Sequence, residues 1–174
     1  MVTSLYVGRF QPFHKGHLHA VKYIANRSDR VIIGIGSALE SHTLRNPFTA
    51  GERMEMILLA IKEANLPLTK FLIIPIPDAP YHKSWVSIVE TLTPSFDVVY
   101  SNEPLTRLLF KEAGYEVREI PLLKREVYSG EEFRRRVINN ENWREIVSEH
   151  IANFLVTKGL IDRVRALVST DKPK

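Results

Sequence analysis

Short apolar runs alternate with helical patterns along the first two thirds of this chain, and this alternation restricts the fold more than any other feature. Five apolar runs have the length of buried strands: residues 5–8, 31–35, 71–74, 98–100 and 115–120. Strands that are apolar on both faces are typical of parallel sheets covered by helices. The segments between the runs carry apolar residues at helical spacing, as at Leu18, Val21 and Ile24.

The order of these patterns predicts the architecture. Strand and helix alternate up to the fifth strand, and a mostly helical tail runs from residue 131 to about 167. We therefore predict an α/β fold: a doubly wound, Rossmann-like parallel sheet of five strands, with helices on both faces and a helical C-terminal segment. We expect a single domain over residues 1–168 and a flexible end over residues 169–174. Functional residues should then follow the carboxyl ends of the strands, where such sheets bind ligands.

The composition excludes several classes of function. The chain has no cysteine, which rules out a disulfide scaffold, a thiolate metal centre and a cysteine nucleophile. No apolar run approaches the roughly 18 residues of a membrane span, and the N-terminus lacks a signal-peptide pattern, so we expect a cytoplasmic protein without a membrane partner. The net charge of +4 suits a protein that handles phosphates, but it would also suit nucleic-acid binding.

The turn after the first predicted strand is the most informative stretch. Residues 8–17 read GRFQPFHKGH and lead into the first predicted helix. Gly8 and Gly16 leave room where a ligand or a backbone segment must come close. The N-terminus of a helix offers unpaired amide donors to an anion. His14 and His17 point the same way if both lie on the first helical turn.

This turn also carries Arg9, and it combines cations and hydrogen-bond donors without a nearby nucleophile arrangement. Transfer to a phosphorus atom suits such a set when the attacking group is already an anion, because the reaction then needs positive charge and donors on the phosphorus oxygens and no general base. Two alternatives stay open. The histidines could be a metal pair, although no carboxylate follows at zincin spacing, or they could be ordinary surface residues.

Residues 14–17 are similar to the His-x-Gly-His signature of the nucleotidyltransferases that resemble class I aminoacyl-tRNA synthetases. Residues 8–14, 41–43 and 46–53 resemble the archaeal nicotinamide mononucleotide (NMN) adenylyltransferases within that superfamily. The resemblance implies an enzyme of NAD biosynthesis that joins ATP and NMN to give NAD and pyrophosphate. The NMN phosphate would attack the α-phosphorus of ATP directly and in line.

The resemblance also implies site residues, cofactor and assembly. His14, His17 and Arg9 would be catalytic. The residues expected to bind ATP are Gly8, Arg9, Phe10, Gln11, His14, Gly16, His17, Arg45, Ser129 and Arg134. Those expected to bind NMN or NAD are Gly36, Ser37, Asp78 and Trp85. Mg²⁺ would be bound mainly through the ATP phosphates, with no metal ligand from the protein, and the chain would form a homo-oligomer, a hexamer by resemblance.

Trp85 has two interpretations. From the sequence alone, a core tryptophan is the simpler one. The resemblance implies instead that its ring stacks on the nicotinamide, with Asp78 close to the carboxamide. Two positions depart from the family pattern: His82 stands where an asparagine is expected, and Glu131 stands where close relatives have threonine.

Residues 129–136 predict the start of another helix. Ser129 and Glu132 have the spacing of a capping box. Three consecutive arginines point in directions about 100° apart on a helix, so they cannot all face one ligand. We expect Arg134 to bind phosphates, and Arg135 and Arg136 to face solvent or another subunit.

Other functions are weaker matches. Another His-x-Gly-His nucleotidyltransferase is the main alternative: pantetheine-phosphate adenylyltransferase, FAD synthetase or cytidylyltransferase. A nucleic-acid-binding module would explain the basic charge, but we find no RNP, KH or helix-turn-helix pattern and expect no nucleic-acid partner. The stretch from Gly34 to Gly36 begins like a dinucleotide fingerprint but lacks its third glycine, so we interpret it as a close-approach turn beside the nucleotide.

Overall fold

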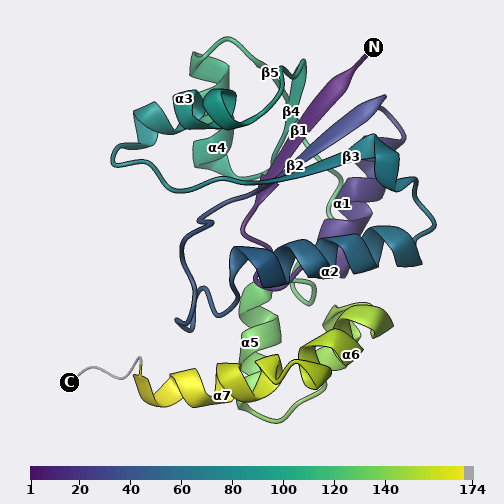
Figure 1. The fold of residues 1–174 in the computed structure, drawn as a ribbon, viewed down its shortest axis with the longest axis vertical. Helices are drawn as coiled ribbons and strands as arrows, with labels where there is room; N and C mark the ends of the chain where they lie inside the picture. Colours follow the sequence, from purple (N-terminus) through teal and green to yellow (C-terminus); the bar gives the residue numbers. More distant parts are fainter. Residues whose placement is uncertain (171–174) are drawn as a thin grey trace.

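The computed structural model describes residues 1–170, and within this range five parallel strands form one sheet in the order β3-β2-β1-β4-β5 (Figure 1). The strands are β1 (Thr3–Gly8), β2 (Arg30–Ile35), β3 (Phe71–Pro75), β4 (Val98–Tyr100) and β5 (Glu116–Arg118). Leu5 of the central strand pairs with Ile32 of β2 and with Val99 of β4. The strand order reverses at β1, so the predicted doubly wound sheet is confirmed, and its switch point lies beside β1.

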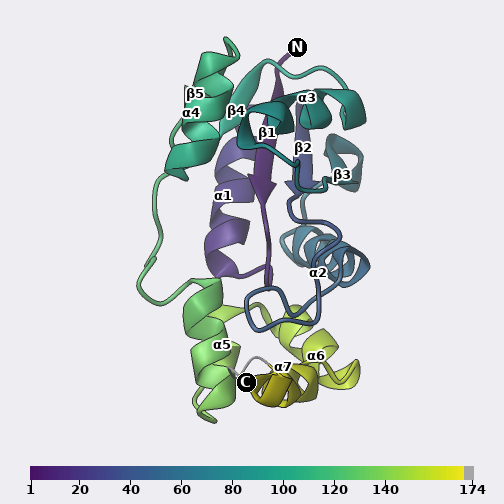
Figure 2. The same cartoon turned by 90° about the vertical axis from the view of Figure 1, so that its left-hand side faces the viewer.

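Helices cover both faces of this sheet. They are α1 (Lys15–Ala25), α2 (Ala50–Glu63), α3 (His82–Leu92), α4 (Pro104–Glu112), α5 (Gly130–Ile138), α6 (Glu149–Thr157) and α7 (Leu160–Thr170), with short 3₁₀ turns η1 (Leu68–Lys70) and η2 (Trp143–Ile146). In Figure 1, α1 and α2 lie on one side of the sheet, and α3 and α4 on the other; Figure 2 views the sheet from the side of α3 and α4. None of the helices in the described residues is long and apolar enough to cross a membrane.

Alternating side chains of the strands enter two separate cores. Tyr6 and Ile33 belong to the larger core, which contains α1, α2 and the C-terminal helices. Leu5 and Ile32 point to the smaller core under α3 and α4. Successive side chains of a strand lie on opposite faces, so a strand buried on both sides must be apolar throughout. The edge strand β5 is shorter than predicted, because it pairs with β4 over three residues only, Glu116 to Arg118.

The C-terminal helices lie beyond the carboxyl edge of the sheet and are attached to α2. α6 packs on α2, and α7 packs on α5. Thr49 and Glu52 form the predicted capping box at the start of α2. Arg163 of α7 donates to both carboxylate oxygens of Glu52, at 2.6 and 2.9 Å. Residues 169 and 170 end α7, and the rest of the expected flexible end, residues 171–174, lies outside the described residues.

Candidate active site

Two cavities open at the carboxyl end of β1, beside the point where the strand order reverses. The histidine pocket, of about 290 Å³, is lined by His14 and His17 and by the segments that follow β4 and β5. The tryptophan pocket, of about 500 Å³, is lined by Trp85 and by the turns that follow β1 and β2. Val7, Gly8 and Glu103 line both pockets. Ligands in the two pockets would therefore meet beside Gly8.

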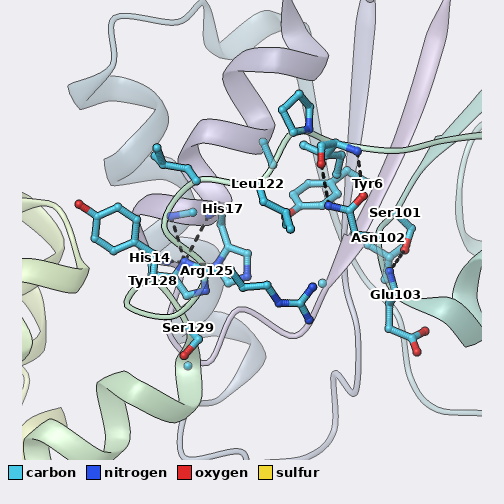
Figure 3. A pocket seen from close by; sticks show the side chains of 18 residues that line it. Tyr6, His14, His17, Ser101, Asn102, Glu103, Leu122, Arg125, Tyr128 and Ser129 are labelled. Atoms are coloured by element: carbon cyan, nitrogen blue, oxygen red, sulfur yellow. Dashed lines mark hydrogen bonds between the residues drawn. The ribbon is translucent and has the colours of Figure 1, made fainter.

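The two histidines cap α1 with their own rings. His14 is the N-cap, and its Nδ1 accepts the backbone N–H groups of Gly16 at 3.1 Å and His17 at 3.3 Å. The Nδ1 of His17 accepts the backbone N–H of His14 at 3.1 Å, and the rings are stacked with centroids 3.6 Å apart (Figure 3). Because each Nδ1 is an acceptor, a neutral ring carries its proton on Nε2. The pair therefore offers two Nε2–H donors.

Both imidazoles are uncharged at neutral pH. Burial lowers the pKa of His14 to about 3. Burial, and then the repulsion between two protonated rings at His14 and His17, lowers the pKa of His17 well below its usual range. Phe10 and Phe13 contact the ring of His17, with centroids 4.8 and 5.4 Å from it. The positive charge of the site must therefore come from arginine.

The glycines of the motif make room for the chain's own rings. A Cβ on Gly16 would lie 2.9 Å from Cε1 of His14, and a Cβ on Gly8 would lie 2.7 Å from the ring of Phe10. Such distances are too short for real contacts, so the glycine between the histidines is required for His14 to cap the helix. The close approach that the sequence predicts at these glycines is thus made by side chains of the same turn.

Phe10 and Gln11 are buried, with 1% and 3% of their surfaces exposed. The Gln11 side-chain amide pairs with the backbone of Phe48: Nε2 donates to the carbonyl at 3.0 Å, and Oε1 accepts the N–H at 2.9 Å. The ring of Phe10 packs between Tyr6 and Phe13. The side chains of Phe10 and Gln11 therefore shape the turn, and the contact of these two residues with ATP stays a prediction.

Three of the predicted arginines gather around this turn. Arg9 and Arg45 line the tryptophan pocket, and Arg9 donates to Oδ1 of Asn46 at 3.1 Å. Arg134 lies over the N-terminus of α5 and donates to the carbonyl of Gln11 at 3.0 Å. Its pKa is lowered to about 10, first by burial and then by the charge of Arg9. Arginine remains protonated at that pKa, so the cluster holds positive charge that favours an anion.

The predicted acceptor residues come together in the tryptophan pocket. Its lining includes Gly36, Ser37, Asp78, Trp85 and also His82. The Ser37 hydroxyl donates to Oδ1 of Asp78 at 3.0 Å, and the N–H of Gly36 donates to the carbonyl of Gly8 at 2.8 Å. Trp85 is half-buried against Phe110 and faces the cavity, so it is not a closed core residue.

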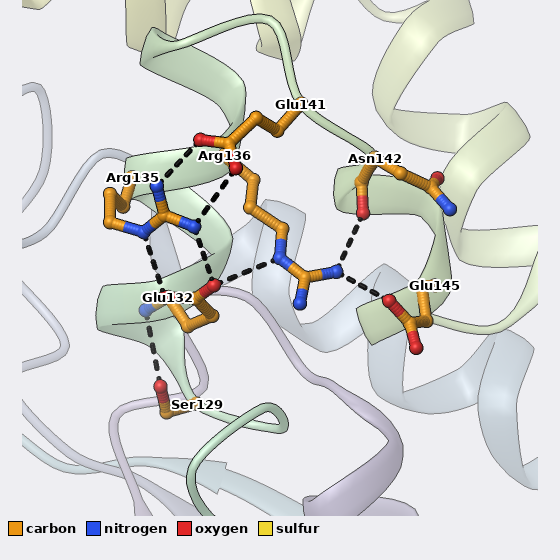
Figure 4. Close-up of polar contacts among 7 residues, drawn as sticks. All are labelled: Ser129, Glu132, Arg135, Arg136, Glu141, Asn142 and Glu145. Atoms are coloured by element: carbon orange, nitrogen blue, oxygen red, sulfur yellow. Dashed lines mark hydrogen bonds and ion pairs between the residues drawn. The ribbon is translucent and has the colours of Figure 1, made fainter.

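Helix α5 differs from the prediction in two respects. The Ser129 hydroxyl accepts the backbone N–H of Glu132 at 3.1 Å, but the Glu132 carboxylate binds Arg135 and Arg136 instead of completing a capping box. Both arginines also bind further carboxylates of the same chain, as Figure 4 shows. The expected exposure to solvent is confirmed for Arg135, whereas Arg136 is mostly buried, and both belong to an ion-pair network between α5 and η2.

Sequence reasoning missed several residues of the site. Arg125 and Asn102 line the histidine pocket, and the Arg125 guanidinium extends across it toward Glu103 (Figure 3). The Asn102 side-chain amide pairs with both backbone groups of Ile120, at 2.7 and 2.8 Å. Arg53 is completely buried behind Arg9. The available signals were weak: an arginine in the loop after the fifth strand, and an arginine on the apolar side of α2.

Most of this chain is similar to known proteins. Residues 5–136 match the cytidylyltransferase-like family. A nicotinamide-nucleotide adenylyltransferase of Methanococcus aeolicus is 51% identical over 154 residues, 88% of either chain. The protein of the same name from Saccharolobus solfataricus is 45% identical over 172 residues, 99% of this chain and 100% of that one.

The fold is found in solved structures as well. A bifunctional NMN adenylyltransferase/ADP ribose pyrophosphatase of Francisella tularensis, complexed with AMP and a manganese ion, matches 97% of this chain with a TM-score of 0.76 and 25% identity. This chain spans 52% of that protein. Identity at the level of the archaeal relatives, over nearly the whole length, shows that the chain belongs to the cytidylyltransferase-like family and, within it, to the nicotinamide-nucleotide adenylyltransferases.

Proposed function

We propose that residues 1–168, acting as one nucleotidyltransferase domain, transfer the adenylyl group of ATP to NMN and release NAD and pyrophosphate, a step of NAD biosynthesis. The observation that carries this proposal is the shared wall of the two pockets. The histidine pair lines one cavity, Trp85 and Asp78 line the other, and both cavities reach Gly8. A nucleotide in one pocket and a phosphate-bearing acceptor in the other would bring their phosphates together there.

The reaction needs no group on the protein to attack or to accept a proton. An oxygen of the NMN phosphate is already anionic and forms the new bond to the α-phosphorus, while the bond to the β-phosphate oxygen breaks and pyrophosphate leaves. The Nε2–H groups of His14 and His17 donate to the α-phosphate oxygens as charge develops on them. A preorganised donor of this kind contributes a factor of about 10²–10³ to the rate.

The arginines hold the phosphates. We assign Arg9 and Arg134 to the β- and γ-phosphates and to the departing pyrophosphate. Arg45 lines the tryptophan pocket together with Arg9, so we assign it to the same phosphates. Backbone N–H groups at the start of α5, beside Ser129, are further donors for the triphosphate.

The donor set fits a Mg²⁺ ion that is bound mainly through ATP. Within residues 1–170, no group of three histidine or carboxylate side chains could hold a metal ion by itself. Glu103 lines both pockets, but its carboxylate already accepts the backbone N–H groups of Leu105 and Thr106. Phosphate oxygens are the ligands that Mg²⁺ prefers, and the ion would neutralise the triphosphate. A cytoplasmic location and a homo-oligomeric assembly remain predictions from the sequence.

Pyrophosphate release tests this function. The protein, Mg²⁺ and ATP are mixed in turn with NMN, nicotinate mononucleotide, phosphopantetheine and FMN, and the products are identified by chromatography. We expect equal amounts of pyrophosphate and NAD with NMN. Release with phosphopantetheine or FMN but not with NMN would contradict the acceptor assignment, and no release with any acceptor would contradict adenylyl transfer.

His17→Ala tests the role of the histidine pair in the same assay. We expect turnover to fall by about 10²-fold or more, because a donor to the α-phosphate is lost. The loss of a cap costs only about 1 kcal/mol, so the variant should stay folded. His19→Ala, on the same helix but outside both pockets, is the matched control and should keep wild-type turnover. Wild-type turnover in His17→Ala would remove this histidine from the mechanism.

A further inference from the structure

Arg53 is the largest fully buried side chain of the described residues. Within residues 1–170, the hydrogen bonds of its guanidinium all go to backbone carbonyl oxygens. The acceptors are Arg9 and Gly36 at 2.8 Å, Thr49 and Ser37 at 3.1 Å, and Glu40 at 3.4 Å. These carbonyls belong to three segments: the turn after β1, the loop after β2, and the N-cap of α2.

The positions of these acceptors connect Arg53 to the tryptophan pocket. One nitrogen, Nη1, donates to Arg9 and to Gly36 at the same time, so it links the turn after β1 to the turn after β2. Arg9, Gly36 and Ser37 all line that pocket, whereas Arg53 lines neither pocket. The guanidinium therefore lies behind the pocket wall and ties together the two backbone turns that form it.

Packing alone does not explain an arginine at this position. Its neighbours on the buried side of α2 are apolar, Met56 and Ile57 among them. A buried charge without a carboxylate partner is costly, and an apolar side chain of similar volume would often be as stable. Only a guanidinium offers five donors in a planar fork that reaches several acceptors. A lysine ammonium could not reach all of these carbonyls from a single nitrogen.

The charge of Arg53 also acts on the site. Burial, and then the charge of Arg9, lowers the pKa of Arg53 to about 10, so the group stays cationic at neutral pH. Carbonyl dipoles solvate this charge but do not cancel it. Its positive potential therefore reaches the region of Arg9, where the phosphates would meet.

From these contacts we propose that Arg53 is a positioning residue for the reaction. It fixes the distance between the turns after β1 and β2. It thereby holds Arg9 and the tryptophan pocket in a fixed position relative to the histidine pair. The assignment of ATP and NMN as ligands rests on the proposed function. The hydrogen bonds by which Arg53 joins the two turns do not depend on it. Misplacement of reacting groups by about 1 Å can cost a factor of about 10² in rate.

Arg53→Lys is the primary test, because it keeps the charge and most of the volume and loses the fork. We expect kcat/KM for NMN to fall by about tenfold to a hundredfold, and the KM for ATP to change less than the KM for NMN. Binding of NMN is followed by the fluorescence of Trp85 in a Trp143→Phe background. Unchanged kcat and KM values in folded Arg53→Lys would overturn the proposal.

Arg53→Ala adds a rescue experiment that a purely structural role would not pass. We expect methylguanidinium to restore turnover to this variant in a saturable manner, whereas methylammonium at the same concentration does not. Circular dichroism reports whether the variant is folded, and if it is not, Arg53→Lys decides. Restored stability without restored turnover would contradict positioning.

Arg163→Met is the matched control. Arg163 also stabilises the N-terminus of α2, through Glu52, but it contacts neither pocket. We expect this variant to unfold at a lower temperature and to keep its kcat and both KM values. An equal loss of activity in Arg163→Met would show that stability alone explains the effect. If the wild type releases no pyrophosphate with NMN, the proposed function fails. Titration of Trp85 fluorescence with NMN in Arg53→Lys still tests whether Arg53 holds the two turns together.

Discussion

Arg134 and Arg135 are neighbours on one helix, yet they lie in opposite electrostatic surroundings. Arg135 and Arg136 form the outer group, which is bound by the carboxylates of Glu132, Glu141 and Glu145 (Figure 4). Arg134, Arg9 and Arg53 form the inner group, whose hydrogen bonds go to carbonyl oxygens and to the amide of Asn46. Adjacent arginines of α5 thus differ in their partners: Arg134 binds a backbone carbonyl, whereas Arg135 and Arg136 bind carboxylates.

The difference shows where positive charge is available to a substrate. Hydrogen bonds with Glu132 and Glu141 raise the pKa of Arg135, and its charge is neutralised by these partners. Burial and the charge of Arg9 lower the pKa of Arg134, which has no carboxylate in hydrogen-bond contact among the described residues. A run of basic residues in a sequence therefore does not measure the phosphate-binding charge. The acceptors that the fold supplies determine it.

The largest expected effect comes from replacing Arg134 and Arg135 one at a time. Arg134→Gln should lower kcat/KM for ATP by about 10²-fold, because a charge-assisted contact with phosphate is lost. Arg135→Gln should stay within about twofold of the wild type, since its charge is already paired. Steady-state pyrophosphate release measures both. Similar losses in the two variants would break the distinction between inner and outer arginines.

A second test asks whether the histidines contribute charge to the inner group. Since burial depresses the pKa of His14 from 6.5 to about 3, its Cε1 proton signal in NMR should not move between about pH 8 and pH 5.

The same shift predicts a loss of stability in acid. The unfolded chain takes up a proton on His14 near pH 6.5 and the folded chain does not, so stability is full above that pH and falls below it. We expect the free energy of unfolding to fall by about 2 kcal/mol for His14 between about pH 7 and pH 5. Urea unfolding at the two pH values measures it, and His14→Asn should abolish this part. A His14 signal that titrates near pH 6.5 in the folded protein would contradict the uncharged pair.

A smaller effect is expected from the ion pair between Arg163 and Glu52, whose side chains are both partly buried. Burial raises the pKa of Glu52, but hydrogen bonds from Arg163 and Thr49 outweigh it, and the net pKa is lowered. The pair therefore stabilises the fold above the ordinary carboxyl pKa, and this contribution is lost as the pH falls through the folded pKa. Arg163→Met should cost about 1 kcal/mol at neutral pH, and less than that in acid. A cost that is independent of pH would exclude the ion pair as its source.

The smallest effect is expected in the outer group itself. Glu141→Gln removes an exposed carboxylate from Arg135 and should lower the unfolding temperature only slightly. That difference should vanish in molar salt, because exposed charges are screened. Thermal unfolding at low and high salt measures it, with turnover as the control. A change in turnover would connect the outer network to the active site.

The sequence was sufficient for the sheet and for the core of the site, because the signals there are local. Val31 to Ile35 is apolar on both faces, which requires cover on both sides. His14 and His17 lie on one helical turn, so their spacing alone determines that the rings meet. Trp85 and Asp78 follow one strand and reach the same pocket for the same reason.

The remaining features depend on tertiary contacts between distant segments. The hydrogen-bond partners of Arg53 come from three segments, and its position on the apolar side of α2 does not identify these partners. Phe10 and Gln11 lie inside the motif, yet whether they contribute side chains or backbone depends on Phe48, which lies 37 residues further along the chain from Gln11. The carboxylates around Arg135 are equally ordinary in sequence.

The capping arrangement of the two imidazoles has one more consequence. Enzymes commonly orient a histidine with an acidic side chain behind it, which fixes the tautomer but places a negative charge close to the chemistry. Here peptide N–H groups at the start of α1 do the orienting, and they carry partial positive charge. Backbone N–H groups orient each imidazole ring. The groups that hold the two imidazole donors in place therefore do not repel a polyanionic substrate.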